Sequence, residues 1–199
     1  MALPATHIRF AIDLKDRFKI LDIGQYVSGT VYPDSRYVTG LERKATHPQE
    51  AENWDLNTCS DFRKGWYVHL LCDQLQKRIM LAAVPSAFEG DKEAVWVQHT
   101  ALKVLQDDID IAQFDIKFFL GGLDYAEAAS GENLADLQRY NKALQTAYQD
   151  NIRAPSLITD LGINEEMQHA LNKQIEIYRR DPVIMEAILG FYDKMIAEV

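Results

Sequence analysis

The longest stretch of the chain with a single hydrophobic period covers residues 92–119 and predicts a long amphipathic helix. Its apolar side chains recur three or four residues apart, at Leu102, Leu105, Ile109, Ala112, Ile116 and Phe119. Gly121 and Gly122 are expected to end this helix. No stretch of the chain alternates convincingly between apolar and polar residues at the period of a strand. The chain is therefore expected to fold from helices alone.

Further helices are predicted from the same spacing. They cover residues 5–19, 60–81, 133–149, 164–179 and 182–197. Residues that favour helix N-termini stand before four of them: Ser60 or Asp61, Asn133, Asn164, and Asp181 with Pro182 behind it. In the segment YVSGTVYPDSRYVTG, Gly29, Pro33 and Gly40 are expected to break any regular element, which predicts a loop. The fold predicted for residues 1–199 is one all-α domain, a bundle of about six or seven helices.

Charge and hydropathy exclude several classes of partner. The chain has 21 Lys and Arg against 30 Asp and Glu, a formal net charge of −9, whereas proteins that bind a nucleic-acid backbone concentrate positive charge on one face. No run approaches the ~20 apolar residues of a membrane span, and the N-terminal residues lack the pattern of a secretory signal. A soluble, cytoplasmic protein is expected, and its oligomeric state is left open.

A histidine and an aspartate stand four residues apart in the apolar run WYVHLLCDQLQ, within the helix predicted at 60–81. Positions i and i+4 share a helix face, so His69 and Asp73 can reach one ion. A carboxylate among the neighbours Trp66, Leu70 and Leu71 is costly to bury unless a cation compensates its charge. The pair therefore predicts a metal clamp.

Three other residues complete a candidate set of metal ligands. His7 lies in the first predicted helix, Asp34 in the predicted loop, and His47 after that loop. Three imidazoles and two carboxylates suit zinc first, with iron and manganese as alternatives. Each has a simpler interpretation: His7 as a helix cap or surface residue, His47 as an ordinary loop residue, and Asp34 as a turn former.

The order of these residues resembles the zinc-dependent phospholipase C-like superfamily, which includes bacterial phospholipase C and the S1–P1 nucleases. The matching elements are His7, the segment GTVYPD ending at Asp34, His47, and HLLCD from His69 to Asp73, all within about the first 75 residues. The resemblance implies an all-α hydrolase of phosphate esters. It further implies that Asp34, His47, His69 and Asp73 hold one metal, and that His7 begins a second site bridged by Asp73.

Two departures from that pattern reduce the expected number of ions. The chain has no N-terminal tryptophan that could act as a ligand, and His99 is followed four residues later by Lys103 where the family has a glutamate. One or two ions are therefore expected, not three. A weaker similarity is to the HD-type phosphohydrolases, although the chain has no adjacent His-Asp pair. Asp108, in QDDID, is open as a later ligand or as part of a solvated patch with Asp107 and Asp110.

The predicted function is hydrolysis of a phosphate ester by a metal-activated water. Bound divalent cations lower the pKa of a water ligand and hold phosphate oxygens. The candidate catalytic residues are Asp73, as a bridging ligand, and Arg36, as a contact for a small phosphorylated substrate in a locally positive stretch with Arg43 and Lys44. That stretch is also open as a solvated loop. The alternative function is a non-catalytic helical binding or structural module that retains a metal site.

Overall fold

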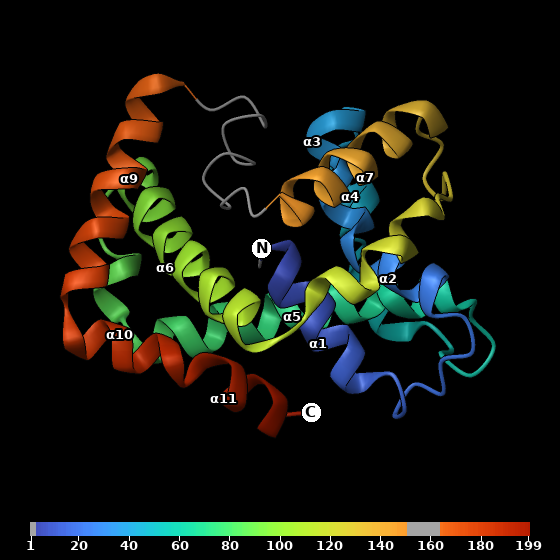
Figure 1. The fold of residues 1–199 in the computed structure, drawn as a ribbon, viewed down its shortest axis with the longest axis horizontal. Helices are drawn as coiled ribbons and strands as arrows, with labels where there is room; N and C mark the ends of the chain where they lie inside the picture. The colour runs from blue at the N-terminus through green and yellow to red at the C-terminus, as the bar shows by residue number, and fades with distance from the viewer. Residues whose placement is uncertain (1–2, 151–163) are drawn as a thin grey trace. The chain divides into compact units, whose positions relative to one another are not determined.

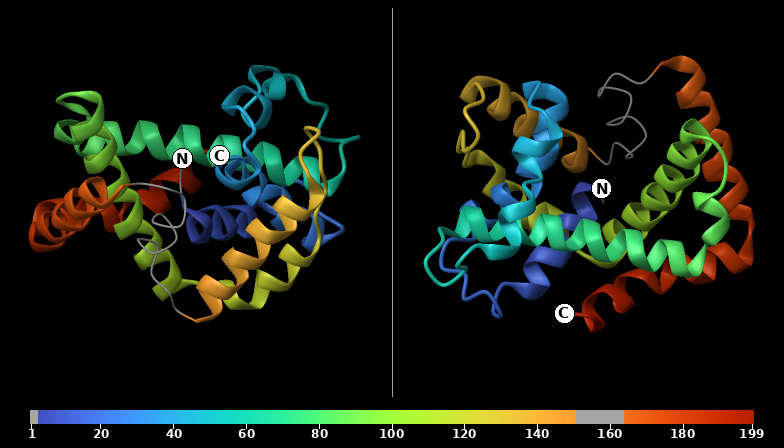
Figure 2. Two further views of the ribbon diagram at one scale, coloured as in Figure 1. Left: turned by 90° about the horizontal axis from the view of Figure 1, so that it is seen from above. Right: turned by 180° about the vertical axis from the view of Figure 1, so that it is seen from behind.

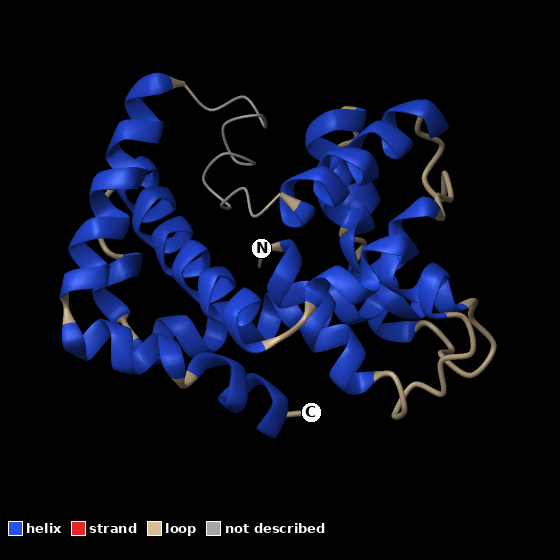
Figure 3. Cartoon of the chain, in the orientation of Figure 1, coloured by secondary structure: helices blue, strands red, loops and turns tan. Residues whose placement is uncertain are grey.

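The computed structural model describes residues 3–150 and 164–199, and in that part of the chain every regular element is helical (Figure 3). This confirms the predicted all-α class. The α-helices (Figure 1) are α1 (Pro4–Leu14), α2 (Ile23–Val31), α3 (Arg36–Thr39), α4 (Arg43–Thr46), α5 (Asp61–Ala83), α6 (Lys92–Gln113), α7 (Leu134–Gln149), α9 (Glu165–Arg180), α10 (Pro182–Leu189) and α11 (Phe191–Ala197). Four 3₁₀ segments accompany them: η1 (Tyr32–Ser35), η2 (Gln49–Asn53), η3 (Pro85–Phe88) and η4 (Ile116–Asp124).

The chain divides into two compact units. The first unit contains Met1–Thr6, Cys72–Gln113 and Arg153–Val199, and the second contains His7–Leu71 and Phe114–Ile152. The prediction of a single domain stays a prediction. Among the described helices, none combines the length and the apolar character that a crossing of the bilayer requires.

In the first unit, α6 packs along α9, and α10 contacts both helices. The views of Figures 1 and 2 agree in placing α6 and α9 side by side. Fully buried side chains of α6 include Ala101 and Leu102, and those of α9 include Leu171. Apolar side chains at helical spacing therefore form the core of this unit, as the sequence predicts.

Polar side chains also lie inside the first unit. Asp107 and Asp110 of α6 are at most 1% exposed. Asp107 Oδ1 accepts a hydrogen bond from the backbone N–H of Thr6 at 3.1 Å, and Asp110 Oδ2 accepts one from Thr6 Oγ1 at 2.6 Å. The first N–H groups of a helix have no partner within it, so Asp107 acts as a remote cap for α1. The interpretation of these aspartates as a solvated patch is wrong.

In the second unit, α2 packs against η4, which in turn packs against α7. Side chains of α7 satisfy carbonyl groups of η4: Asn141 Nδ2 donates to Leu123 O at 3.0 Å, and Gln145 Nε2 donates to Leu120 O at 3.0 Å. These bonds supply partners that a short 3₁₀ segment cannot supply for itself.

Two glycines allow α2 and α5 to cross with their backbones in contact. A Cβ atom at Gly29 of α2 would lie closer than 3.0 Å to the carbonyl oxygen of Phe62 on α5. Reciprocally, a Cβ atom at Gly65 of α5 would lie closer than 3.0 Å to the carbonyl oxygen of Tyr26 on α2. No other residue type could occupy either position without separating the helices.

The predicted loop over residues 26–40 is wrong, because most of this segment is helical. Gly29 lies inside α2, where its missing side chain serves the crossing and does not break the helix. Pro33 lies at the start of η1, where a proline costs no hydrogen bond. Only Gly40 ends an element as predicted: it follows α3 with a left-handed φ of 73°.

The helix predicted at 92–119 ends earlier than expected, at Gln113. Gly121 and Gly122 do not stop it, since both lie inside η4. A Cβ atom at Gly122 would be 3.0 Å from Val27 Cβ, so this glycine serves the close packing of η4 on α2. Ala112, placed by the sequence on the buried stripe, is exposed.

The remaining helix predictions agree with the structure to different degrees. α7 and α9 begin directly after Asn133 and Asn164, whose side chains accept hydrogen bonds from Ala135 N and Met167 N. α5 begins after Ser60, which accepts from Arg63 N at 3.3 Å. The first helix is shorter than predicted and ends at Leu14, and the last is divided at Gly190 into α10 and α11.

Candidate metal centre

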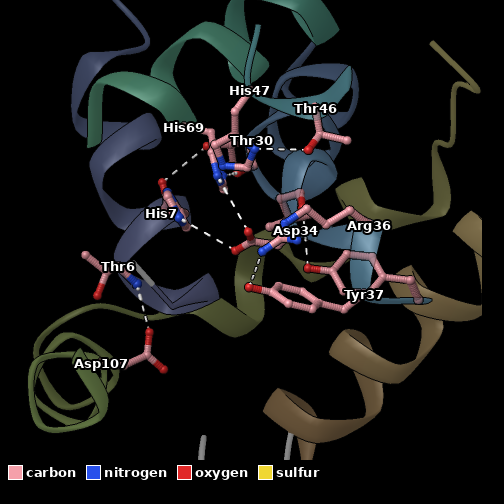
Figure 4. A network of polar contacts seen from close by, with 12 residues as sticks. Thr6, His7, Thr30, Asp34, Arg36, Tyr37, Thr46, His47, His69 and Asp107 are labelled. Carbon is pink, nitrogen blue, oxygen red and sulfur yellow. Dashed lines mark hydrogen bonds and ion pairs between the residues drawn. The ribbon is translucent and has the colours of Figure 1, made fainter. Parts of the chain in front are cut away.

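Three predicted ligands meet in the second unit. His7 of α1, Asp34 of η1 and His69 of α5 each bring one ligand atom to within 4.8 Å of the others (Figure 4). Asp34 Oδ2 lies 4.0 Å from His7 Nε2, and Asp34 Oδ1 lies 3.8 Å from His69 Nε2. Both separations exceed a hydrogen bond and are a few tenths of an ångström wider than the ~3.4 Å between neighbouring ligands of a tetrahedral zinc ion.

These three side chains are almost completely buried. His7 is 1% exposed, His69 is 0% exposed and Asp34 is 7% exposed. The two imidazole rings stack with centroids 3.8 Å apart and planes 13° apart. This arrangement excludes His7 as a surface residue or helix cap. Asp34 does lie in the tight 3₁₀ segment η1, but its carboxylate is buried beside the two imidazoles. Stacked rings that both turn a nitrogen toward one carboxylate suit a shared cation.

The orientation of the His69 ring is fixed by the backbone. Its Nδ1 atom lies 2.8 Å from the carbonyl oxygen of Thr30, near the end of α2. A carbonyl can only accept, so Nδ1 carries a hydrogen, and in the neutral ring the lone pair is then on Nε2. Metal-binding histidines are usually held in this way by a partner on the second nitrogen. The glycine-mediated crossing of α2 and α5 is what brings Thr30 close enough.

Asp34 is held in place by aromatic packing of the segment around it. Tyr32, two residues earlier in η1, makes edge contacts with Phe62 at 5.2 Å and with Trp66 at 4.8 Å between ring centroids. Both partners belong to α5, the helix that carries His69. On the other side, burial raises the pKa of Tyr140 well above its ordinary value, and the nearby Asp34 carboxylate adds to the rise. Tyr140 thus stays protonated beside this carboxylate.

His47 approaches His69 from the end of α4. The indole N–H of Trp66 donates to the carbonyl oxygen of Thr46 at 2.7 Å, which fixes the end of α4 against α5. Thr46 Oγ1 and His47 Nδ1 share a hydrogen bond of 3.0 Å. The rings of His47 and His69 then meet edge to face, with centroids 5.4 Å apart. His47 is only partly buried, unlike the other histidines of the cluster.

Asp73 follows His69 by one turn of α5, as its spacing predicts. His47, His69 and Asp73 form a second group whose ligand atoms lie within 4.8 Å of one another. The five residues predicted as ligands therefore form two triads that share His69. Because Nδ1 of His69 is bonded to Thr30, only Nε2 remains for a metal, and one nitrogen lone pair binds one ion.

Arg36 lies two residues after Asp34, at the start of α3. Its guanidinium stacks on the ring of Tyr37, 4.0 Å from the centroid, and hydrogen-bonds to the hydroxyl of the same residue. Its Nε atom is buried and has no hydrogen-bond partner in the described part of the chain. The guanidinium is thus held in one place while part of its hydrogen-bonding capacity remains for another group.

Other polar residues considered from the sequence are not members of the two groups of possible ligands. Arg43 and Lys44 are exposed, and Lys44 pairs with Glu42 at 2.8 Å. Asp108 pairs with Arg179 at 3.1 Å, and within the described residues no group of possible ligands includes it. His99 also lies outside these groups.

Sequence reasoning missed two residues that support the centre. Thr30 was missed because its segment was predicted to be a loop. It supports the centre through its backbone carbonyl group, which no pattern of side chains indicates. Trp66 was identified only as a buried neighbour, although its indole N–H positions the element that carries His47. The helical spacing i, i+3 from Trp66 to His69 could have signalled a shared role.

The chain matches no protein-family model, no curated protein and no solved structure. Its resemblance to the phospholipase C-like superfamily therefore stays a prediction.

Proposed function

We propose that this chain is a metal-dependent hydrolase of phosphate esters that acts on a small phosphorylated substrate. The observation that carries the proposal is the buried triad of His7, Asp34 and His69, with the tautomer of His69 fixed by Thr30. A carboxylate and two imidazoles are costly to bury together unless a cation compensates the charge. A cytoplasmic location is part of the same proposal.

The donor set fits a divalent cation. Imidazole nitrogen and carboxylate oxygen suit zinc, with iron and manganese as alternatives. His7, Asp34 and His69 would hold the ion, and His47 and Asp73 lie within reach of His69 as further ligands. A bound cation of this type supplies a water ligand with a pKa lowered toward neutrality, which is the nucleophile such hydrolysis requires.

The protein side chains have separate tasks in this scheme. Thr30 O accepts the Nδ1 hydrogen of His69, which turns Nε2 toward Asp34 and leaves Nε2 as the nitrogen that would bind the ion. Arg36 binds the phosphate of the substrate, since a guanidinium pairs with phosphate oxygens through fixed donors. The stacked Tyr37 ring keeps that guanidinium from rotating.

The experiment that tests the function uses untagged protein, because a histidine tag would bind metal itself. Metal content is measured by mass spectrometry, and hydrolysis of p-nitrophenyl phosphate and bis(p-nitrophenyl) phosphate is measured before and after chelation. We expect bound metal and hydrolysis of at least one ester, lost with the chelator and restored by the metal. Metal-loaded protein that cleaves neither ester would count against catalysis.

The shared nitrogen of His69 predicts one tightly bound ion per chain. The variant His7→Ala should then bind that single ion with lower affinity, since one ligand of its triad is lost. A metal titration monitored by calorimetry measures both the number of binding sites and the affinity of each site for the metal. Two equivalent high-affinity ions in the wild type, reduced to one in His7→Ala, would contradict the single-centre arrangement.

Arg36→Ala is expected to lower kcat/KM by about 10- to 100-fold, the effect of losing a charged hydrogen bond worth ~1.5–3 kcal/mol. Metal content should not change, because Arg36 contacts the substrate and not the ion. Arg43→Ala is the matched control, since Arg43 is a neighbouring exposed arginine. Equal kinetics for the wild type and Arg36→Ala would remove Arg36 from the substrate site.

A structural metal site is the second candidate, and the burial of the triad favours it. His7 and His69 are at most 1% exposed, as expected for a coordinatively closed centre. Of the five candidate ligands His47 is the one that is partly exposed, so substrate would have to reach a catalytic centre from its side. A metal-dependent rise in melting temperature without ester hydrolysis would select the structural alternative.

A further inference from the structure

The first unit contains a cavity that the proposed hydrolase function does not use. Its volume is about 560 Å³, within the range of sites for small organic ligands. The wall consists of the first two turns of α6 and the start of α9, with side chains from Lys92, Glu93, Val95, Trp96, His99 and Met167. Trp96, Val95 and Met167 make much of this wall apolar.

His99 is the polar group of the cavity that solvent does not satisfy. Its Nε2 atom is buried and has no hydrogen-bond partner in the residues that the structure describes. The ring rests on Phe88, with centroids 4.7 Å apart, and this contact fixes its plane. Leaving a buried polar atom unpaired costs about 1–3 kcal/mol, so a group that pairs with it gains affinity.

His99 is neutral at physiological pH. Burial, aided by the positive charges of Lys103 and Lys77, lowers its pKa to about 3. A neutral imidazole carries one donor and one acceptor nitrogen, and a hydroxyl group can serve either one. The ligand group that faces His99 should therefore be an uncharged hydroxyl and not a carboxylate.

The charged residues of the cavity do not select for a charged ligand. Lys92 and Glu93 are both exposed, adjacent and of opposite sign, so their fields largely cancel. Trp96 offers an aromatic face, and Met167 offers a polarizable thioether that contacts aromatic rings well. The wall thus suits a flat, uncharged aromatic ring.

We propose that this cavity binds a small uncharged aromatic molecule bearing a hydroxyl group, with the ring against Trp96 and Met167 and the hydroxyl on His99. This site does not depend on the metal centre or on the proposed hydrolase function. It assigns a role to His99, which is not among the candidate metal ligands.

The test compares two probes that differ in one hydroxyl group, p-cresol and toluene. Each is titrated into ¹⁵N-labelled full-length protein, and binding is followed by the indole N–H signal of Trp96. We expect both probes to shift that signal and p-cresol to bind about tenfold more tightly, which corresponds to one hydrogen bond to His99. Toluene is the more apolar molecule, so apolar partitioning alone would give the opposite order.

Three variants make the result specific to His99. His99→Phe should abolish the preference for p-cresol and keep toluene binding, whereas His99→Gln, which retains hydrogen-bonding capacity, should keep a preference. The control His169→Phe changes an exposed histidine of α9 and should behave as the wild type. The proposal is overturned if neither probe shifts Trp96, or if folded His99→Phe still prefers p-cresol.

Discussion

Replacing His69 by alanine should remove the bound metal and reduce ester hydrolysis more than about 100-fold. Loss of an outer-shell partner alone typically costs 10- to 100-fold, and His69 belongs to both ligand triads. The measurement pairs metal content with hydrolysis rate. His169→Ala is the control, since it removes an exposed histidine outside both triads.

Because His69 is fully buried, its loss could also weaken the fold, and melting curves separate the two effects. Metal should raise the melting temperature of the wild type and leave that of His69→Ala unchanged. Asp34→Asn keeps the size and shape of the Asp34 side chain and removes its charge. This variant should therefore bind metal more weakly, with a smaller loss of stability than His69→Ala. Full metal occupancy in both variants would eliminate this cluster as the metal centre.

Gly65→Ala should destabilise the protein by about 3 kcal/mol or more, at the upper end for overpacking. In a helix, alanine is more favourable than glycine by ~1 kcal/mol. Helix propensity alone would therefore predict that Gly65→Ala stabilises the protein. The new Cβ atom would collide with the backbone carbonyl of Tyr26, which cannot move without shifting α2. The expected fall in melting temperature is roughly 6–12 °C for a chain of this size.

Urea unfolding measures this loss, and Gly121→Ala is the matched control. Gly121 lies in η4, and no atom lies within 4 Å of the position that its Cβ would occupy. We expect the free energy of unfolding of the control to lie within about 0.5 kcal/mol of that of the wild type. An unchanged urea midpoint for Gly65→Ala would show that α2 and α5 do not need their close approach.

The helices that could be predicted are those whose signals are local. Asn133 and Asn164 cap the N-termini of α7 and α9, and a capping side chain bonds within three residues of itself. The segment around Gly29 could not be predicted, since the role of that glycine depends on a carbonyl of Phe62 more than 30 residues away. In isolation, a glycine inside an apolar segment reads as a break.

The same distinction applies to the candidate centre. His69 and Asp73 could be paired because one helix sets their spacing. His7 and Asp34 were candidates from their residue types, and the resemblance placed them in different sites. Their convergence on His69 could not be predicted, since no local pattern joins three separate elements. The burial of Asp107 was not foreseen either, because its partner is the backbone of Thr6, 101 residues earlier.

The hydrogen bond from His69 Nδ1 to Thr30 O means that the backbone of α2, and not a side chain, sets the orientation of the His69 ring. Its acceptor is a main-chain oxygen, so every amino acid that sustains α2 at position 30 can supply it. Replacing the Thr30 side chain would leave this acceptor in place, and would test instead the packing of a buried side chain whose hydroxyl donates to His7 O. Anyone grafting the three ligands onto another scaffold would lose this support unless the helix crossing were transferred as well. The transferable unit is the crossing of α2 and α5 together with α1 and η1, which carry His7 and Asp34.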